Sequence, residues 1–360
     1  MISPLPCRWK RGLFLSTLPV ALATVLLGGC DKAKELVDQG KEKIAEMQKQ
    51  SETPPADATA PVAPAPVTQA APAPVAMSED QILASILAKE AYQRNDEDLT
   101  KLAALSEPYR TRVDVLNLRG AQVTEVGLQN LAKLTGLKEL QMTQARLTPG
   151  GYAAIGNATS LEKLVLDNSD INDNTLGSLK GLIHLKSLNL ETTQISDAGL
   201  AQLRQCTELE ELQISNTMID GSCFRQMKNL AVLKKLGAYN TRIGSAGASS
   251  LRAAKNLEHL SIGKAGISDP FLAELKGCVN LVELNLQENA VSDAGIKFLS
   301  GCIKLEKLNL KSTGVTDQGL VQVFGRAKNL KEVYAPGSGI SERGAAALKK
   351  KIPDVNVILQ

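Results

Sequence analysis

The sequence predicts an α/β solenoid, in which one short unit is repeated many times and stacked along an axis. The first observation is a period of 24 residues that runs without insertion through eight successive units from Val113. The second is that each unit begins with apolar residues spaced LxxLxL, so that alternate side chains of a short strand point to one face. The third is a Ser, Thr or Asp that precedes a short apolar helix. Repeats of this length stack into one continuous core.

A single unit is too small to fold alone. About seven buried aliphatic residues contribute on the order of 14 kcal/mol at roughly 2 kcal/mol each. Ordering the backbone of one unit costs more than that, at about 1 to 2 kcal/mol per residue. We therefore expect one array, stabilised by contacts between neighbouring units. The units begin at Val113, Leu137, Leu161, Leu185, Leu209, Leu233, Leu257, Leu281, Leu305 and Leu330, and the ninth has one extra residue.

Three units carry the same pattern where their helix begins. It stands as Ser196-Asp197-Ala198-Gly199-Leu200, Ser292-Asp293-Ala294-Gly295-Ile296 and Thr316-Asp317-Gln318-Gly319-Leu320. The first residue can cap the helix, and the aspartate lies where the helix dipole favours a negative charge. The units resemble leucine-rich repeats, in particular the 24-residue bacterial forms and the cysteine-containing forms with a Thr/Ser-Asp-x-Gly-Leu pattern. The resemblance implies a right-handed horseshoe with a parallel concave sheet and convex helices.

Residues 1–29 are predicted to be a signal peptide. Three basic residues precede an apolar run from Leu13 to Leu27, which is shorter than the ~20 residues that a membrane-spanning helix needs. The sequence Leu27-Gly28-Gly29-Cys30 resembles the lipobox of bacterial lipoproteins. It implies cleavage between Gly29 and Cys30 and acylation of Cys30, for example with palmitate. The alternative is an ordinary signal peptide that contains a cysteine.

The same resemblance implies a place in the bacterial cell envelope, where a lipid-anchored chain would face the periplasm. Two or more acyl chains on Cys30 would form a stable membrane anchor. Asp31 directly after Cys30 resembles an inner-membrane retention signal, and the outer membrane is the alternative.

Three segments are expected between the anchor and the repeats. Residues 30–50 contain the lipidated Cys30 and a short polar helix, which is either a coiled coil or a solvated helix. Residues 51–77 hold seven of the fifteen prolines and are predicted to be a Pro/Ala-rich disordered linker. In residues 78–112, Ser78 and Gln81 form a capping-box pattern, and we expect a helical N-terminal cap there. The repeats then occupy residues 113–360 and end in a C-terminal strand cap.

Three cysteines occupy the same position of the repeat. Cys206, Cys278 and Cys302 stand where other units have leucine, so we expect them to fill a buried apolar column. A disulfide between Cys278 and Cys302 is the alternative in an oxidising compartment. No Cys or His spacing indicates a metal site, and we expect no cofactor.

Charge and composition exclude several classes of function. Beyond residue 29 the chain has 38 Lys and Arg and 38 Asp and Glu, so its net charge gives no basic field for nucleic acid. Only two histidines are present, and no nucleophile elbow, metal pair or phosphate loop is found. The sequence therefore predicts that the protein is not an enzyme.

The strands alternate between apolar and polar residues, which predicts that one face of the sheet is open. Amides, charges and aromatic side chains stand on that face, and the concave surfaces of solenoids bind extended partners. The same residues would also suit a merely solvated face, most of all the group of Tyr239, His259 and Glu191. The candidate partner-binding residues are Asn189, Glu191, Gln213, Tyr239, His259, Asn285, Gln287, Asn309 and Lys311.

These observations predict a membrane-anchored scaffold that holds an unidentified protein partner on the concave face of the repeats. One alternative is a structural spacer or envelope organiser with weak contacts, in which the anchor and linker matter most. A lower-ranked alternative is an enzyme or a glycan-binding module. The sequence leaves the oligomeric state open.

Overall fold

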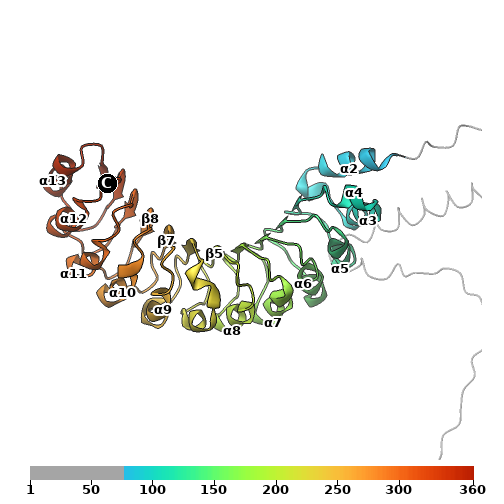
Figure 1. Cartoon of the computed structure of the whole chain (residues 1–360), viewed down its shortest axis with the longest axis horizontal. Coiled ribbons are helices and arrows are strands. Elements are labelled where there is room, and N and C mark those ends of the chain that lie inside the picture. The colour runs from blue at the N-terminus through green and yellow to red at the C-terminus, as the bar shows by residue number, and fades with distance from the viewer. Residues whose placement is uncertain (1–76) are drawn as a thin grey trace, which may run out of the picture. The chain divides into compact units, whose positions relative to one another are not determined.

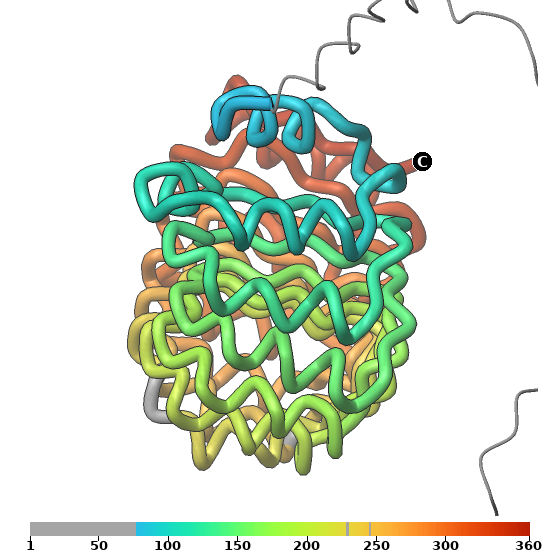
Figure 2. Tube along the Cα trace, turned by 90° about the vertical axis from the view of Figure 1, so that its right-hand side faces the viewer, coloured from blue at the N-terminus to red at the C-terminus, as the bar shows by residue number. Residues whose placement is uncertain are grey.

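Residues 77–360 are described by a computed structural model, and they form a curved array of stacked repeats (Figures 1 and 2). The signal peptide, Cys30, the polar helix and nearly all of the linker lie outside these residues, so their predictions stay untested. Among residues 77–360, no helix combines the length and apolar character that crossing a membrane requires.

One parallel sheet runs through the whole array. Its eleven strands pair in chain order, each with the next. Paired residues are 24 apart through β9, as in Leu188 with Leu212, so equivalent residues form straight rows across the sheet. The strands are β1 (Val115–Asn117), β2 (Glu139–Gln141), β3 (Lys163–Val165), β4 (Ser187–Asn189), β5 (Glu211–Gln213), β6 (Lys235–Gly237), β7 (His259–Ser261), β8 (Glu283–Asn285), β9 (Lys307–Asn309), β10 (Glu332–Tyr334) and β11 (Asn356–Ile358).

Helices follow the strands on the convex side and leave the concave face of the sheet open (Figure 1). The α-helices are α2 (Glu79–Leu87), α3 (Asp96–Ala104), α4 (Glu107–Arg110), α5 (Glu125–Leu128), α6 (Pro149–Gly156), α7 (Asp173–Leu176), α8 (Asp197–Leu200), α9 (Gly244–Leu251), α10 (Asp269–Glu274), α11 (Asp293–Ile296), α12 (Asp317–Phe324) and α13 (Glu342–Lys351). Short 3-10 helices lie at Ala91–Gln93, Gln129–Lys133, Gly177–Gly181, Ala201–Leu203, Ser222–Gln226, Lys228–Ala231, Leu275–Gly277 and Lys297–Leu299. The structure is therefore the predicted horseshoe of leucine-rich-repeat type.

The repeated aliphatic residues form one continuous core from Leu83 to Val355. In the fourth repeat, Leu185, Leu188, Leu190 and Ile195 are all buried. Cys206, Cys278 and Cys302 are also buried, which confirms the predicted column. All cysteines among residues 77–360 are free thiols, so the alternative disulfide is not formed. Burial raises the pKa of Cys278 to about 11, which keeps its thiol protonated and unreactive at neutral pH.

A polar ladder closes the turn after each strand. In the fourth repeat the Thr193 hydroxyl donates to the carbonyl of Leu190 at 2.6 Å. Asn289 bridges two repeats, since its amide nitrogen donates to Ile262 O and Leu286 O. Alanine at this position, Ala121 and Ala145, leaves the ladder incomplete in the first two repeats. The same bond to the carbonyl three residues earlier is made by Ser169, Thr217, Thr241, Thr313 and Ser338.

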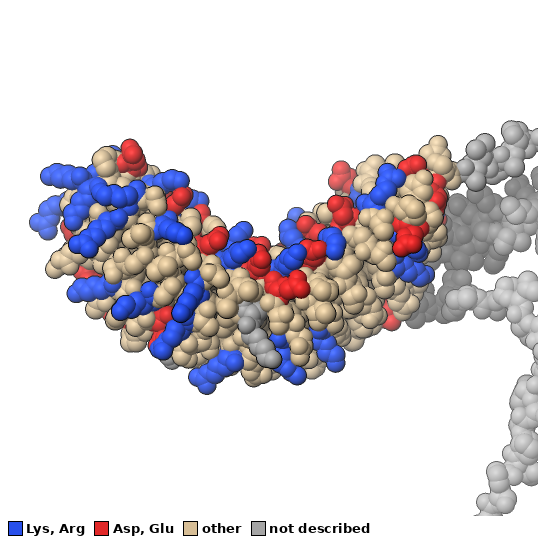
Figure 3. Space-filling view, viewed as in Figure 1, with Lys and Arg blue, Asp and Glu red and all other residues tan. Residues whose placement is uncertain are grey.

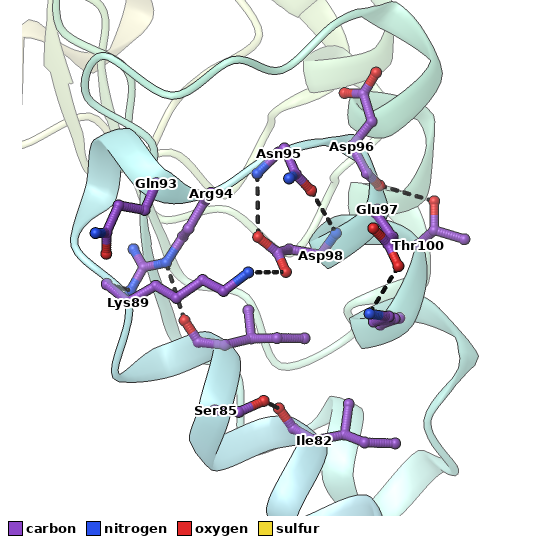
Figure 4. Close-up of polar contacts among 12 residues, drawn as sticks. Ile82, Ser85, Lys89, Gln93, Arg94, Asn95, Asp96, Glu97, Asp98 and Thr100 are labelled. Atoms are coloured by element: carbon purple, nitrogen blue, oxygen red, sulfur yellow. Dashed lines mark hydrogen bonds and ion pairs between the residues drawn. The ribbon is translucent and has the colours of Figure 1, made fainter. Parts of the chain in front are cut away.

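The predicted N-terminal cap covers one end of the core. Ser78 and Gln81 form the expected capping box of α2, and side chains of α2 and α3 join the core. Between these helices, Lys89 contacts Asp98 at 2.6 Å (Figure 4). The buried Arg94 guanidinium donates to the carbonyls of Leu87, Lys89 and Asn117, which ties the cap to β1. At the other end β11 pairs with β10, and α13 contributes Leu348 to the core.

A chain of carboxylates links neighbouring repeats on the convex side. Asp293, in the first turn of α11, accepts hydrogen bonds from the Thr316 amide at 2.8 Å and hydroxyl at 2.6 Å. Thr316 belongs to the next repeat and caps α12. We call this arrangement the aspartate clip. Equivalent two-bond clips join Asp96 to Thr124, Asp173 to Ser196, Asp269 to Ser292 and Asp317 to Ser341.

The clip explains the glycine at the fifteenth position of the repeat. A Cβ added to Gly319 would overlap the Asp293 carboxylate, and one added to Gly295 would overlap that of Asp269. Where Cys223 replaces this glycine, the α-helix gives way to a 3-10 helix that follows Gly221 at φ +86°. There the Asp197 carboxylate accepts from the backbone amides of Asp220 and Cys223.

Candidate binding surface on the concave face

The concave face contains a hollow over β6 to β10. Its volume is about 600 Å³. The floor is made of buried strand leucines and small residues, and charged and amide side chains border it. The lining residues are Gln213, Lys235, Leu236, Gly237, His259, Leu260, Ser261, Glu283, Leu284, Asn285, Lys307, Leu308, Asn309, Glu332 and Tyr334.

The hollow exists because side chains are missing at its upstream end. The fifth residue of each repeat points to the concave face, and in repeats six and seven it is Gly237 and Ser261. A Cβ on Gly237 would meet the Gln213 side-chain oxygen, so Gln213 occupies part of the free space. The seventh residue of repeat seven is Gly263, and the Tyr239 ring lies beside it.

A row of charged residues forms one wall, at the third position of each repeat. Glu283 contacts Lys307 at 2.6 Å and His259 at 3.2 Å. The ammonium of Lys307 holds the pKa of Glu283 below its usual range. Among residues 77–360, neither Lys235 nor Glu332 has a partner within ion-pair distance. The hollow therefore has an uncompensated cation at one end and an uncompensated anion at the other.

The asparagines of the opposite wall already make hydrogen bonds within the protein. Asn285 Oδ1 accepts from the Gln287 amide at 3.1 Å, and Asn309 Oδ1 accepts from the Lys311 amide at 3.0 Å. Asn189 does the same for Glu191. These side chains close the end of each strand, so only their NH2 groups are available to a partner. The Asn309 NH2 already donates to Gln287 at 3.0 Å.

Four of the nine predicted binding residues line the hollow, namely Gln213, His259, Asn285 and Asn309. The other five do not: Asn189, Glu191, Tyr239, Gln287 and Lys311. In the group of Tyr239, His259 and Glu191, for which the solvated face was the favoured interpretation, Glu191 and Tyr239 share the seventh-position row two repeats apart, and His259 stands in the third-position row. His259 pairs with Glu283 in the third-position row, while Glu191 follows β4 and Tyr239 follows β6.

Sequence reasoning missed the residues that shape the hollow. Lys235, Glu283, Lys307 and Glu332 belong to the third-position row, which alternates in charge along the later repeats. That alternation was a usable signal. Gly237 was missed because an absent side chain gives no polar pattern. Among residues 77–360, no three His, Cys, Asp or Glu side chains form a group able to hold a metal ion, and the hollow offers the chemistry of a binding surface.

The family model described as Leucine Rich repeat matches residues 181–203, 277–300 and 301–323. No curated protein matches the chain. The solved structures that are similar include an internalin from Listeria monocytogenes, with 22% identity and a TM-score of 0.54 over 78% of this chain and 93% of that one. Another is an octameric complex of latrophilin 3, Unc5D and the leucine-rich-repeat protein FLRT2, with 18% identity and a TM-score of 0.52 over 71% and 85%. These matches show that the chain contains leucine-rich repeats and has their solenoid fold.

Proposed function

We propose that this protein is a lipid-anchored interaction scaffold of the bacterial envelope, which holds a protein partner in the hollow over β6 to β10. The observation that carries the proposal is the hollow itself: an open concave surface with free charges at both ends, Lys235 and Glu332, and a glycine in its floor. FLRT2, which shares the fold, was solved in a complex with other proteins, and this supports a binding role.

The polarity of the hollow favours an extended polar segment as the bound element. Lys235 lies in β6 and Glu332 in β10, four strands apart, which is roughly 19 Å at ~4.8 Å per strand. An extended chain covers that span in about six residues. The NH2 groups of Asn285 and Asn309 on the opposite wall each donate one hydrogen within the protein, to Ser261 and Gln287, and their second hydrogen can donate to the carbonyl groups of the extended chain. Partner charges opposite Lys235 and Glu332 would set its direction.

The anchor part of the proposal rests on the sequence Leu27-Gly28-Gly29-Cys30. Acylation at Cys30 would hold the repeats at the periplasmic side of a membrane, with the inner membrane favoured by Asp31. Labelled palmitate is expected in the wild type and not in Cys30→Ser. Equal labelling of the two proteins would refute lipid attachment and leave the hollow untouched.

The substitution Gly237→Gln tests the hollow directly, because it fills the floor with a side chain that Gln141 and Gln213 already carry at the same repeat position. A photo-cross-linking residue is placed at Glu332, on the wall, in the full-length protein in cells. We expect a discrete cross-linked adduct, and we expect Gly237→Gln to abolish it while the unfolding transition is unchanged.

Val165→Gln is the matched control, since it makes the same residue at the same repeat position in β3, outside the hollow. It should leave the adduct intact. An adduct that survives Gly237→Gln, or that both variants weaken equally, would refute the hollow as the binding site. If shortening residues 51–77 then abolished the cellular phenotype while Gly237→Gln did not, the spacer function would be supported instead.

A further inference from the structure

The balanced charge of the chain conceals a strong asymmetry along the array. Residues 77–232 contain 15 Lys and Arg against 20 Asp and Glu, whereas residues 233–360 contain 18 against 11. The first half is therefore acidic and the second half basic. Figure 3 shows Lys and Arg gathered on the visible face over the C-terminal repeats. The net charge gives no basic field when the whole chain is counted, as expected, but residues 233–360 taken alone are basic.

Part of this charge lies on one edge of the array, in the turns that lead into the strands. The last two residues of repeats six to nine contribute Lys255, Val279, Ile303, Lys304 and Lys328, which we call the basic edge. The same two positions in the first five repeats contain no Lys or Arg. The basic edge is thus a local feature of the second half and not a property of the repeat.

Hydrogen bonds from side-chain amides hold the turns of the basic edge in line. Asn280 donates to the carbonyl of Lys255, and Asn329 donates to that of Ile303. Lys328 reaches the carbonyl of Lys351 at 2.7 Å, so the edge is continuous with the three lysines that end α13. The adjoining turn of the tenth repeat adds one acid, Asp354.

The lysines of the basic edge can still attract an anionic partner, although the ammonium of Lys304 donates to Asn280 Oδ1 at 2.8 Å and that of Lys328 donates to Lys351 O. Lys255, Lys304 and Lys328 are exposed, and among residues 77–360 none of them lies within ion-pair distance of a carboxylate. Two aliphatic side chains lie between them: Ile303 is 58% exposed and Val279 is 44% exposed. Val279 lies beside Gly301 of the next repeat, which has no side chain to cover it.

We infer that the basic edge docks onto the surface of an anionic phospholipid bilayer. Lysines near such a surface are attracted by its negative potential, and exposed aliphatic side chains can enter the headgroup region. Nucleic acid is the weaker fit, because the edge offers it no aromatic side chain for base stacking. The inference does not depend on the hollow, which lies on the concave face. A scaffold docked in this way would lie along the membrane with its hollow open to the side.

The test uses residues 77–360, which contain the whole continuous core and leave out Cys30. The probes are vesicles of phosphatidylcholine alone and of phosphatidylcholine mixed with phosphatidylglycerol, followed by sedimentation. We expect binding to the mixed vesicles only, weakening as salt is added. Lys255→Glu combined with Lys304→Glu should weaken it by roughly tenfold or more, and Ile303→Ser should weaken it less.

Arg242→Glu combined with Lys264→Glu is the control. Both residues are exposed in the same part of the array, in the turns that follow the strands, and the change in charge is the same. This control should keep its affinity for the vesicles. Equal loss in the two double variants, equal binding to neutral vesicles, or no binding at all would overturn the inference.

Two further arms separate the possible outcomes. Binding of a single-stranded oligonucleotide that depends on Lys255 and Lys304, without vesicle binding, would also overturn the inference. Gly237→Gln should bind vesicles normally, and the basic-edge variant should keep the cross-linked adduct. Failure of membrane docking and failure of the proposed partner site are therefore distinguishable.

Discussion

The junctions between the last repeats and those between the central repeats differ on the convex side. Asp269, Asp293 and Asp317 clip three successive junctions near the C-terminus. At the same repeat position the centre has Gly221 and Ser245, which have no carboxylate. The central repeats therefore stack through their apolar core without these charge-assisted bonds, each of which contributes about 1.5 to 3 kcal/mol.

The presence or absence of a clip also explains which residue stands at the fifteenth position of the next repeat. Where a clip is present the next repeat has glycine, as in Gly295, Gly319 and Gly344, because the carboxylate needs the space. Where the clip is missing a larger side chain can enter, and Phe271 fills the position that follows Ser245. The floor of the hollow belongs to these same central repeats, at Gly237 and Ser261. The unclipped junction between repeats six and seven thus lies behind the upstream end of the hollow, whereas clips join the repeats behind the rest of it.

The largest expected effect comes from Gly319→Ala, which forces the Asp293 carboxylate away from Thr316. We expect a loss of about 2 kcal/mol in the free energy of unfolding, measured by urea denaturation of residues 77–360. In the double variant with Asp293→Ala the overlap with the carboxylate is gone, and the flexible Ile296 side chain, 3.0 Å away, is the remaining close neighbour of the added methyl group. The loss in the double variant should therefore be smaller than the sum of the losses in the two single variants. Full additivity would show that the glycine is not required by the clip.

A smaller effect is expected when one clip is weakened by Asp317→Asn. The amide and hydroxyl of Ser341 hold the pKa of Asp317 below its usual range. The carboxylate therefore stabilises the fold above its unfolded pKa of about 4, and this contribution is lost as the pH falls through the folded value. We expect a cost of about 1 kcal/mol at pH 7, which shrinks in acid.

Glu342→Gln is the control for this experiment, because Glu342 has the same position in the tenth repeat and its carboxylate makes no clip among residues 77–360. Its cost should stay within about 0.5 kcal/mol. The difference in unfolding free energy between Asp317→Asn and wild type should disappear at a pH where Asp317 is fully protonated. If the difference were the same at every pH, the charge of Asp317 would be ruled out as its source.

The smallest effect concerns a feature that both regions share, the left-handed eighth residue of each repeat. Thr192 adopts φ +56° there, while Asn168, Asn216 and Asn240 adopt similar values. A β-branched residue is unfavourable in this region, and asparagine tolerates it. Thr192→Asn should stabilise the array by about 0.5 kcal/mol, and Asn216→Thr should cost a similar amount. An opposite sign in thermal denaturation would show that the turn is not strained by threonine.

The periodic part of the structure could be predicted from the sequence. Burial of Leu188, Leu190 and Cys206, and the capping box at Ser78, depend on local spacing, which the sequence states directly. The aspartate clip could not be predicted from the sequence, because the dipole of its own helix already explains an aspartate in the first turn. Its actual partners lie one repeat further along the chain. The binding residues were placed only in part, since the hollow is set by Gly237 and by the pairing of His259 with Glu283.

Native-state hydrogen exchange of residues 77–360 tests most directly whether the clips divide the array. The amides of β6 and β7, beside the unclipped junctions, should open with a lower free energy than those of β9 and β10. Gly319→Ala should then lower protection in β9 and β10 toward the central level. Equal protection along all of these strands in the wild-type protein would contradict the account.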